Sequence, residues 1–164
     1  MKKYLLALGT VPILLALGTS NVLADQSRLC SAIEDTIGVD PATTIRSIGE
    51  PLRRSEKKVQ NRFDNSLDKS ILLEYPNGYV DIYYVTHLDK YIFYGAQLDR
   101  RNFNARISSA IPSSLASAVK MYGAPDKQTG AGVLYFCDIT EYSYVELFVR
   151  NADVTGFKYT QEEL

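Results

Sequence analysis

Histidine, the residue that most often serves as a general acid or base, occurs once in the 164-residue sequence, as His87. It lies in a predicted turn with Asp89 nearby, and nothing in the sequence points to a nucleophile for a Ser–His–Asp or Cys–His site. Clusters of His, Cys and Asp at metal-ligand spacing, a P-loop lysine and a GxGxxG motif are also missing. We therefore predict a protein that is not an enzyme, with no catalytic residues, no metal and no cofactor.

One pair of acids leaves an enzyme open as an alternative. Asp81 and Glu146 could meet across a sheet, as the two carboxylates of a glycosidase do. Acids on a solvated strand face are much commoner than such pairs, and a histidine in an exposed turn needs no catalytic role. The enzyme class would require a deep polar pocket around one of these groups.

An excess of positive charge and a long apolar run are missing as well. The sequence has 18 Lys and Arg against 19 Asp and Glu, a net charge of −1, whereas nucleic-acid-binding proteins are basic overall. Beyond the N-terminus, no stretch approaches the ~18 apolar residues of a membrane-spanning helix. We expect no nucleic-acid partner and no membrane span after the N-terminal segment is removed.

That N-terminal segment has the composition of a signal peptide. Lys2 and Lys3 precede a short apolar run at 5–17, and the Val22-Leu23-Ala24 triplet fits the small-x-small rule for cleavage after Ala24. Cleavage removes two lysines and no acids, so the charge becomes −3. The prediction is a secreted or periplasmic protein with a signal peptide at 1–24. An uncleaved anchor is an alternative, and a lipoprotein is a weaker one because Arg28 precedes Cys30 where a small residue is expected.

Only two cysteines are present, Cys30 and Cys137. An even number of cysteines in an exported chain favours a disulfide, and this one would close a loop of over 100 residues. Two free thiols are the alternative. Since there is no CxxC motif, redox chemistry is not expected.

The most informative feature present is a motif that occurs twice. A short amphipathic helix stopped by Gly-x-Pro ends at Pro51 and again at Pro125, 74 residues later. In the first copy, Asp40 is the predicted N-cap and Pro41 the first helical residue. Each copy is followed by tyrosine-rich strand patterns. The spacing predicts two tandem repeats, residues 25–99 and 100–164, that form one compact domain.

Local patterns place the elements within these repeats. Fourfold apolar spacing predicts a first helix at 25–38, and alternating β-branched and aromatic residues between turn signals predict β-meanders. The predicted helices are 25–38, 41–48, 102–109 and 112–122, and the predicted strands are 57–63, 71–75, 79–86, 91–98, 133–137, 142–150 and 154–159. The fold class expected is α+β, with helices packed on one face of a curved antiparallel sheet.

Strand alternation separates an aliphatic face, which belongs against the helices, from an unusual second face. A sheet covered on one side normally has a polar outer face, but here aromatic side chains are mixed with charged ones, as in protein–protein hot spots. The predicted protein-binding residues are Tyr79, Asp81, Tyr83, Tyr91, Phe93, Tyr142, Tyr144, Glu146, Phe148 and Arg150. Cross-strand aromatic pairs that simply stabilise the sheet are the alternative interpretation.

The doubled plan of helix, turn, helix ending in Gly-x-Pro, then aromatic strands resembles the tandem-repeat fold of the β-lactamase inhibitor protein (BLIP) family. It is also similar to the BamE-type outer-membrane-assembly lipoproteins, which have one repeat. The resemblance rests on residues 45–51 and 119–125 and implies a continuous curved sheet whose concave face grips a protein. It further implies that a loop of the first repeat enters the active site of the target, and 76–78 and 87–90 are the candidate loops. The chain departs from the family in lacking tryptophan and in having one predicted disulfide between the halves.

Together these patterns predict an exported, non-enzymatic protein-binding module. Its expected partner is another protein, and inhibition of a secreted or periplasmic enzyme is the leading hypothesis. The alternative is a structural or assembly factor of the cell envelope, like the BamE-type lipoproteins. The two hypotheses differ in the partner, a soluble enzyme in the first and an outer-membrane complex in the second.

Overall fold

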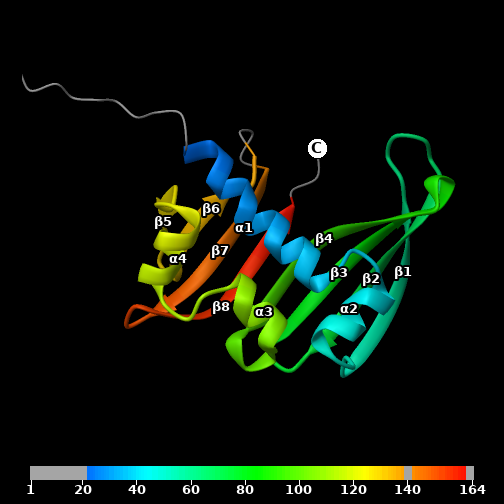
Figure 1. Ribbon diagram of the computed structural model, residues 1–164. Coiled ribbons are helices and arrows are strands. Elements are labelled where there is room, and N and C mark those ends of the chain that lie inside the picture. The colour runs from blue at the N-terminus through cyan, green and yellow to red at the C-terminus, as the bar shows by residue number, and fades with distance from the viewer. Residues whose placement is uncertain (1–21, 139–141, 162–164) are drawn as a thin grey trace, which may run out of the picture.

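The computed structural model describes residues 22–138 and 142–161, with side chains from Arg28 onward, and has the expected α+β class (Figure 1). Eight strands form a single antiparallel sheet in the order β1-β2-β3-β4-β8-β7-β6-β5. The strands are β1 (Arg53–Gln60), β2 (Leu67–Tyr75), β3 (Gly78–Val85), β4 (Lys90–Asp99), β5 (Lys127–Gln128), β6 (Gly132–Phe136), β7 (Ser143–Arg150) and β8 (Asp153–Gln161). The predicted signal peptide lies outside the described residues, except for 22–24 at the start of the first helix.

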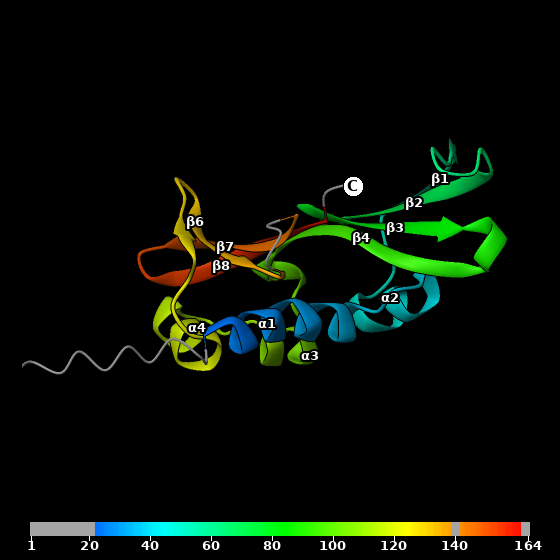
Figure 2. The same ribbon diagram turned by 90° about the horizontal axis from the view of Figure 1, so that it is seen from above.

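Four helices accompany the sheet. They are α1 (Val22–Ile37), α2 (Pro41–Ile48), α3 (Ala105–Ala110) and α4 (Leu115–Tyr122), and short 3₁₀ turns, η1 (Thr86–Leu88) and η2 (Arg100–Asn102), follow β3 and β4. Figure 2 shows the helices on one side of the sheet, whose outer strands β1, β2 and β6 rise away from them. The other side of the sheet, called here the open face, is therefore concave.

The predicted caps explain where α2 begins and ends. The Asp40 carboxylate accepts a hydrogen bond from the Thr43 amide at 2.9 Å and so satisfies one of the unpaired donors at the helix start. At the other end, Gly49 has a φ of +116°, which favours glycine, and its amide donates to the Ile45 carbonyl. In α4, Ser114 and Gly123 take the equivalent positions.

The core lies between the helices and the sheet. Leu29, Ile33 and Ile37 recur every fourth residue on α1 and are at most 1% exposed, which confirms the predicted apolar stripe. Phe157 of β8 is fully buried, and burial of such a ring contributes about 2 kcal/mol. Its neighbours across the ladder are Leu98 of β4 and Leu147 of β7, so this ring packs the two halves together.

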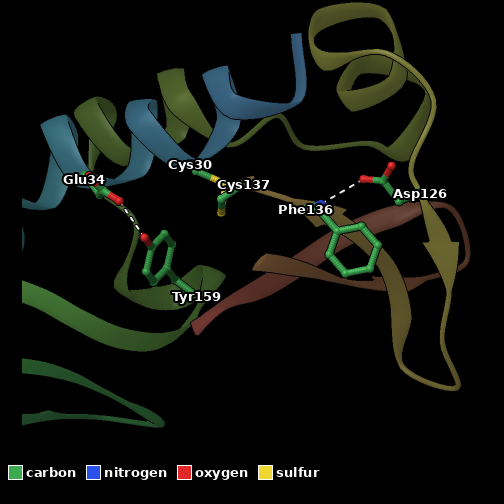
Figure 3. The surroundings of a disulfide bond; sticks show 6 residues. All are labelled: Cys30, Glu34, Asp126, Phe136, Cys137 and Tyr159. Atoms are coloured by element: carbon green, nitrogen blue, oxygen red, sulfur yellow. Dashed lines mark hydrogen bonds between the residues drawn. A yellow bond between two sulfur atoms is a disulfide. The ribbon is translucent and has the colours of Figure 1, made fainter. Parts of the chain in front are cut away.

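Cys30 and Cys137 form a disulfide, as the cysteine count predicts (Figure 3). The bond links α1 to the residue that follows β6. One helical turn beyond it, the Tyr159 hydroxyl donates to the Glu34 carboxylate at 2.5 Å. Burial, followed by this hydrogen bond, raises the pKa of Tyr159 far above the usual tyrosine range. The first helix is thus fastened to the second half of the sheet by one covalent and one polar link.

Several predicted boundaries differ from those of the structure; β2, for example, begins at Leu67 rather than at 71. The first strand runs over Arg53–Gln60 rather than 57–63, so Phe63 lies in the loop that follows it. The predicted helix at 102–109 is divided into the η2 turn and α3, because Asn104 leaves the helical conformation and caps α3 by accepting from the Ile107 amide. Local apolar spacing does not reveal such a break, whereas an Asn before an apolar run can.

Candidate binding surface

The open face carries most of the polar and aromatic side chains that strand alternation assigns to it. In β3, Tyr79, Asp81 and Tyr83 alternate with Val80 and Ile82, which are fully buried under the helices. In β7, the face has Tyr144, Glu146 and Phe148, which alternate with buried Val145 and Leu147. Neighbouring strands add Ile92, Tyr94 and Gln97 of β4, Lys158 and Thr160 of β8, and Leu134 and Phe136 of β6.

The expected placement of Tyr91 and Phe93 on this face is wrong. The register between β3 and β4 shifts after the Asp81–Gly95 pair, and Ile82 then pairs with Phe93. Phe93 is 3% exposed and packs on the helix side with its ring 4.9 Å from that of Tyr159. Tyr91 also lies on the helix side, 4.8 Å from the Tyr84 ring.

A β-bulge at Tyr94 is the physical reason. The extra residue on the bulged strand reverses the alternation, so Ile92 and Tyr94 occupy the open face in place of Tyr91 and Phe93. These two residues were missed by sequence reasoning. The signal that could have found them is Gly95, a glycine inside a strand pattern, which often marks a bulge.

The two remaining predicted residues lie at the ends of β7. Tyr142 precedes the strand and is 43% exposed. Arg150 is the last residue of the strand and lines a separate hollow with Asp99, Arg101 and Asp153. Tyr142 and Arg150 thus lie at the two ends of β7, and neither lines the central hollow described next.

A hollow of about 420 Å³ lies where β4 and β8 join the two halves. Tyr79, Tyr94 and Lys158 form its sides, and Gly95 leaves room at its floor. Asp81 also lines it. Burial raises the pKa of this carboxyl and outweighs a hydrogen bond from Ser70 at 3.2 Å, which acts in the opposite direction. The hollow therefore combines aromatic walls with a half-buried acid.

Several polar groups on the open face are held in place. Thr129, in the loop before β6, donates to Glu146 at 2.5 Å. The Tyr83 hydroxyl donates to Asp68 at 3.1 Å, and the Tyr83 ring lies 6.4 Å from that of Tyr94. Side chains fixed in this way lose less conformational entropy when a partner binds.

The single histidine lies in the short turn that follows β3. His87 is exposed in η1 and pairs with Asp64 at 3.0 Å, far from the hollow at the centre of the sheet. Within 22–138 and 142–161, no group of His, Cys, Asp and Glu side chains could hold a metal ion. In the same part of the chain, none of the helices has the length and apolar character to cross a membrane.

Comparison of the chain with protein-family models, curated proteins and solved structures finds no match.

Proposed function

We propose that the protein is an exported, non-enzymatic module that binds another protein through its open face. The observation that carries the proposal is a concave sheet whose exposed side has aromatic rings in both halves, among them Tyr79, Tyr94, Tyr144 and Phe148. Tyrosine and phenylalanine provide a large contact area at low side-chain entropy cost. Large apolar patches on a monomer usually mark an interaction site.

Inhibition of a secreted or periplasmic enzyme is the use that we propose for this face. A concave surface fits the convex rim of a globular partner, and half-buried polar groups such as Asp81 and Glu146 can select the partner by hydrogen bonding. The resemblance to the BLIP family favours the same use. Inhibitors of this kind act by occluding a site and need no catalytic group of their own.

We further propose that the two halves are tandem repeats. The helices α2 and α4 are eight residues each and start 74 residues apart, and β1 and β5 begin at the same offset. Both meanders have a bulge in their last strand, with an unmatched residue followed by Gly95 in β4 and by Gly156 in β8. A duplicated module would explain why the open face continues across both halves.

An envelope structural or assembly factor is the second candidate. It is favoured by the predicted signal peptide and by the similarity to the BamE-type lipoproteins. Such a factor would use the same face on an outer-membrane complex, so the identity of the partner separates the two functions.

Capture of the partner with matched variants tests the proposal. The mature protein is immobilised and exposed to culture medium and to envelope extract of the cells that encode it, and retained proteins are identified by mass spectrometry. The test variant is Tyr79→Ala with Tyr144→Ala. The control is Met121→Ala, which removes a 48% exposed apolar side chain from α4, on the opposite side of the molecule.

The proposal expects a partner that the control retains and the double variant loses. A soluble enzyme whose activity falls when the protein is added supports the inhibitor, and an outer-membrane complex supports the assembly factor. Equal capture by both variants would show that the open face is not the binding surface.

A further inference from the structure

The sheet opens between β4 and β8. The two strands pair only over Gly95–Asp99 of β4, and Figure 1 shows them separating toward the end at which β8 finishes. Residues Lys90–Phe93 pair with β3 on one side, and on the other side no described strand pairs with them. This segment is called here the β4 edge. It is a strand edge in the interior of the sheet rather than at its border.

A hollow of about 450 Å³ lies in this opening. All four residues of the β4 edge line it on one side, and Ser143 and Gln161, which pair with each other at the ends of β7 and β8, line it on the other. Cys30 and Glu34 of α1 line it on the helix side. Because Gln161 also lines the central hollow of the open face, the opening adjoins the proposed binding surface.

The two borders of the sheet are protected against the addition of a strand, and the β4 edge is not. At one border β5 has only two residues, and at the other β1 carries five charged side chains in eight residues. Short edges and charged edges are means by which proteins prevent pairing with another chain. The β4 edge has one charged residue, Lys90, followed by Tyr91, Ile92 and Phe93, which are residue types that favour strands. Its sequence therefore permits pairing where the borders prevent it.

Aromatic contacts hold the β4 edge in place. On the helix side of the sheet, the Tyr91 ring lies 4.8 Å from that of Tyr84, and the Phe93 ring lies 4.9 Å from that of Tyr159. An edge that is already fixed loses little conformational entropy when another strand pairs with it.

The turn that leads into the β4 edge is fixed by a buried carboxylate. Asp68 is fully buried and accepts from Asn61 at 2.8 Å, from the Thr86 amide at 2.8 Å and from Tyr83 at 3.1 Å. Burial alone would raise the pKa of Asp68, but these hydrogen bonds outweigh burial and lower it. The start of β4 is therefore anchored to the loop between β1 and β2.

We propose that the β4 edge pairs with an extended segment of the partner protein, which becomes an additional strand between β4 and β8. The inference rests on the proposed function and adds the conformation in which one part of the partner binds. The N–H and C=O groups along a strand edge are complementary to the backbone of another strand, so the occupant is defined by its extended backbone. Its β-branched side chains would pack well beside the aromatic residues of the β4 edge.

NMR titration of the isotope-labelled mature protein with a synthetic strand tests this inference. The probe is Thr-Val-Thr-Val-Thr with blocked ends, whose β-branched residues favour an extended chain. The control peptide has the same side chains and a methyl group on every backbone nitrogen, so it cannot donate backbone hydrogen bonds. The probe should shift the amide signals of Lys90–Phe93 and Gln161 and slow the hydrogen exchange of the β4-edge amides that face the opening. The methylated control should bind about tenfold more weakly.

Protein variants locate the site. Ile92→Lys places a second charge on the β4 edge and should weaken binding of the probe several-fold, whereas Ile92→Val should retain it. Val59→Lys is the matched control, because Val59 is also a half-buried aliphatic residue on the open face but lies on β1, and its affinity should stay unchanged. The spectra of the free variants verify that they fold.

Equal binding of the methylated control, absence of shifts in the β4 edge, or unchanged affinity in Ile92→Lys would overturn the inference. Complete protection of the β4 edge from hydrogen exchange in the free protein would also overturn it. The opening would then already be filled, by residues 162–164 if the protein tumbles as a monomer and by a second copy if it tumbles as a dimer. Because partner capture with the Tyr79 and Tyr144 variant needs no peptide, a failed titration with persistent capture would refute this inference alone.

Discussion

The two outermost hairpins of the sheet begin alike and end differently. The strand β1 starts four residues after Gly49 and β5 starts four residues after Gly123, but β1 has eight residues and β5 has two. After β5, the chain turns back at once, with Thr129 bonded to Glu146. After β1, it extends past the helices into the loop that carries Phe63.

The two ends are also stabilised in different ways. The second half is fastened to α1 by the Cys30–Cys137 disulfide and the bond between Tyr159 and Glu34. The extended end of the first half depends on Asp68, which holds its two loops together. The same order of elements therefore forms one half that is cross-linked to α1 and one half whose end projects beyond the helices. A substitution that destabilises one of these ends should leave the other unchanged.

Removal of the disulfide should have the largest effect. Because the cysteines are 107 positions apart, replacing both by alanine (Cys30→Ala with Cys137→Ala) should lower the free energy of unfolding by about 5 kcal/mol in the chain-entropy model. Urea denaturation of the oxidised protein and the variant measures this difference. Reduction of the unaltered protein is the control and should shift the midpoint similarly; equal midpoints for all three would contradict the prediction.

Asp68→Asn should have the next largest effect and lower the free energy of unfolding by about 2 kcal/mol, because an amide cannot accept all the hydrogen bonds that the carboxylate does. Amide hydrogen exchange should rise in 61–66 and at Thr86 and stay unchanged in α1.

The same carboxylate predicts a pH dependence. Because the pKa of Asp68 is lowered in the folded state, its stabilisation is present above the ordinary value of 3.8 and is lost as the pH falls through the folded-state pKa. Protection of the two loops should therefore decrease on acidification below that value in the unaltered protein and remain flat in Asp68→Asn. An equal loss of protection in the unaltered protein and in Asp68→Asn would show that other groups cause the pH dependence.

Tyr159→Phe should lower the free energy of unfolding by about 1 kcal/mol, since it removes one hydrogen bond and leaves Glu34 able to bond with water. Hydrogen exchange should increase around α1 and β8, while the loops around Asp68 keep their protection. Faster exchange in those loops instead would mean that the two halves do not behave independently.

Gly95→Ala should have the smallest effect on stability, within about 0.5 kcal/mol, because an added Cβ would meet only the Tyr159 carbonyl at 3.4 Å. The methyl group would nevertheless narrow the central hollow and should weaken partner binding. Gly132→Ala is the contrasting variant, since its Cβ would lie 1.9 Å from the Leu147 carbonyl and must distort β6. Thermal unfolding measures both, and a loss of stability in Gly95→Ala comparable to that in Gly132→Ala would be the contrary result.

Local chemistry made much of the fold predictable. The caps at Asp40 and Gly49 are set by neighbouring residues, and the buried stripe of α1 follows from its fourfold spacing. The pairing of Cys30 and Cys137 was predictable because no other cysteine is present.

The missed features depend on contacts that are distant in sequence. Tyr91 and Phe93 face the helices because of a bulge, which alternation alone does not reveal. Phe63 leaves the first strand because the loop closes around Asp68, whose other donors come from Tyr83 and Thr86. The main features of the open face were therefore predictable, whereas the position of the loop that carries Phe63 required the structure.

The position of β8 has a consequence for how the protein folds. It is the last strand in chain order, yet it lies between β4 and β7 in the interior of the sheet. Until it is available, the two meanders are separate sheets with exposed inner edges. Pairing of β4 with β8 joins segments about sixty residues apart, and such distant pairings form slowly. We expect completion of the sheet to be a late step in folding, which would suit the proposed export of an unfolded chain.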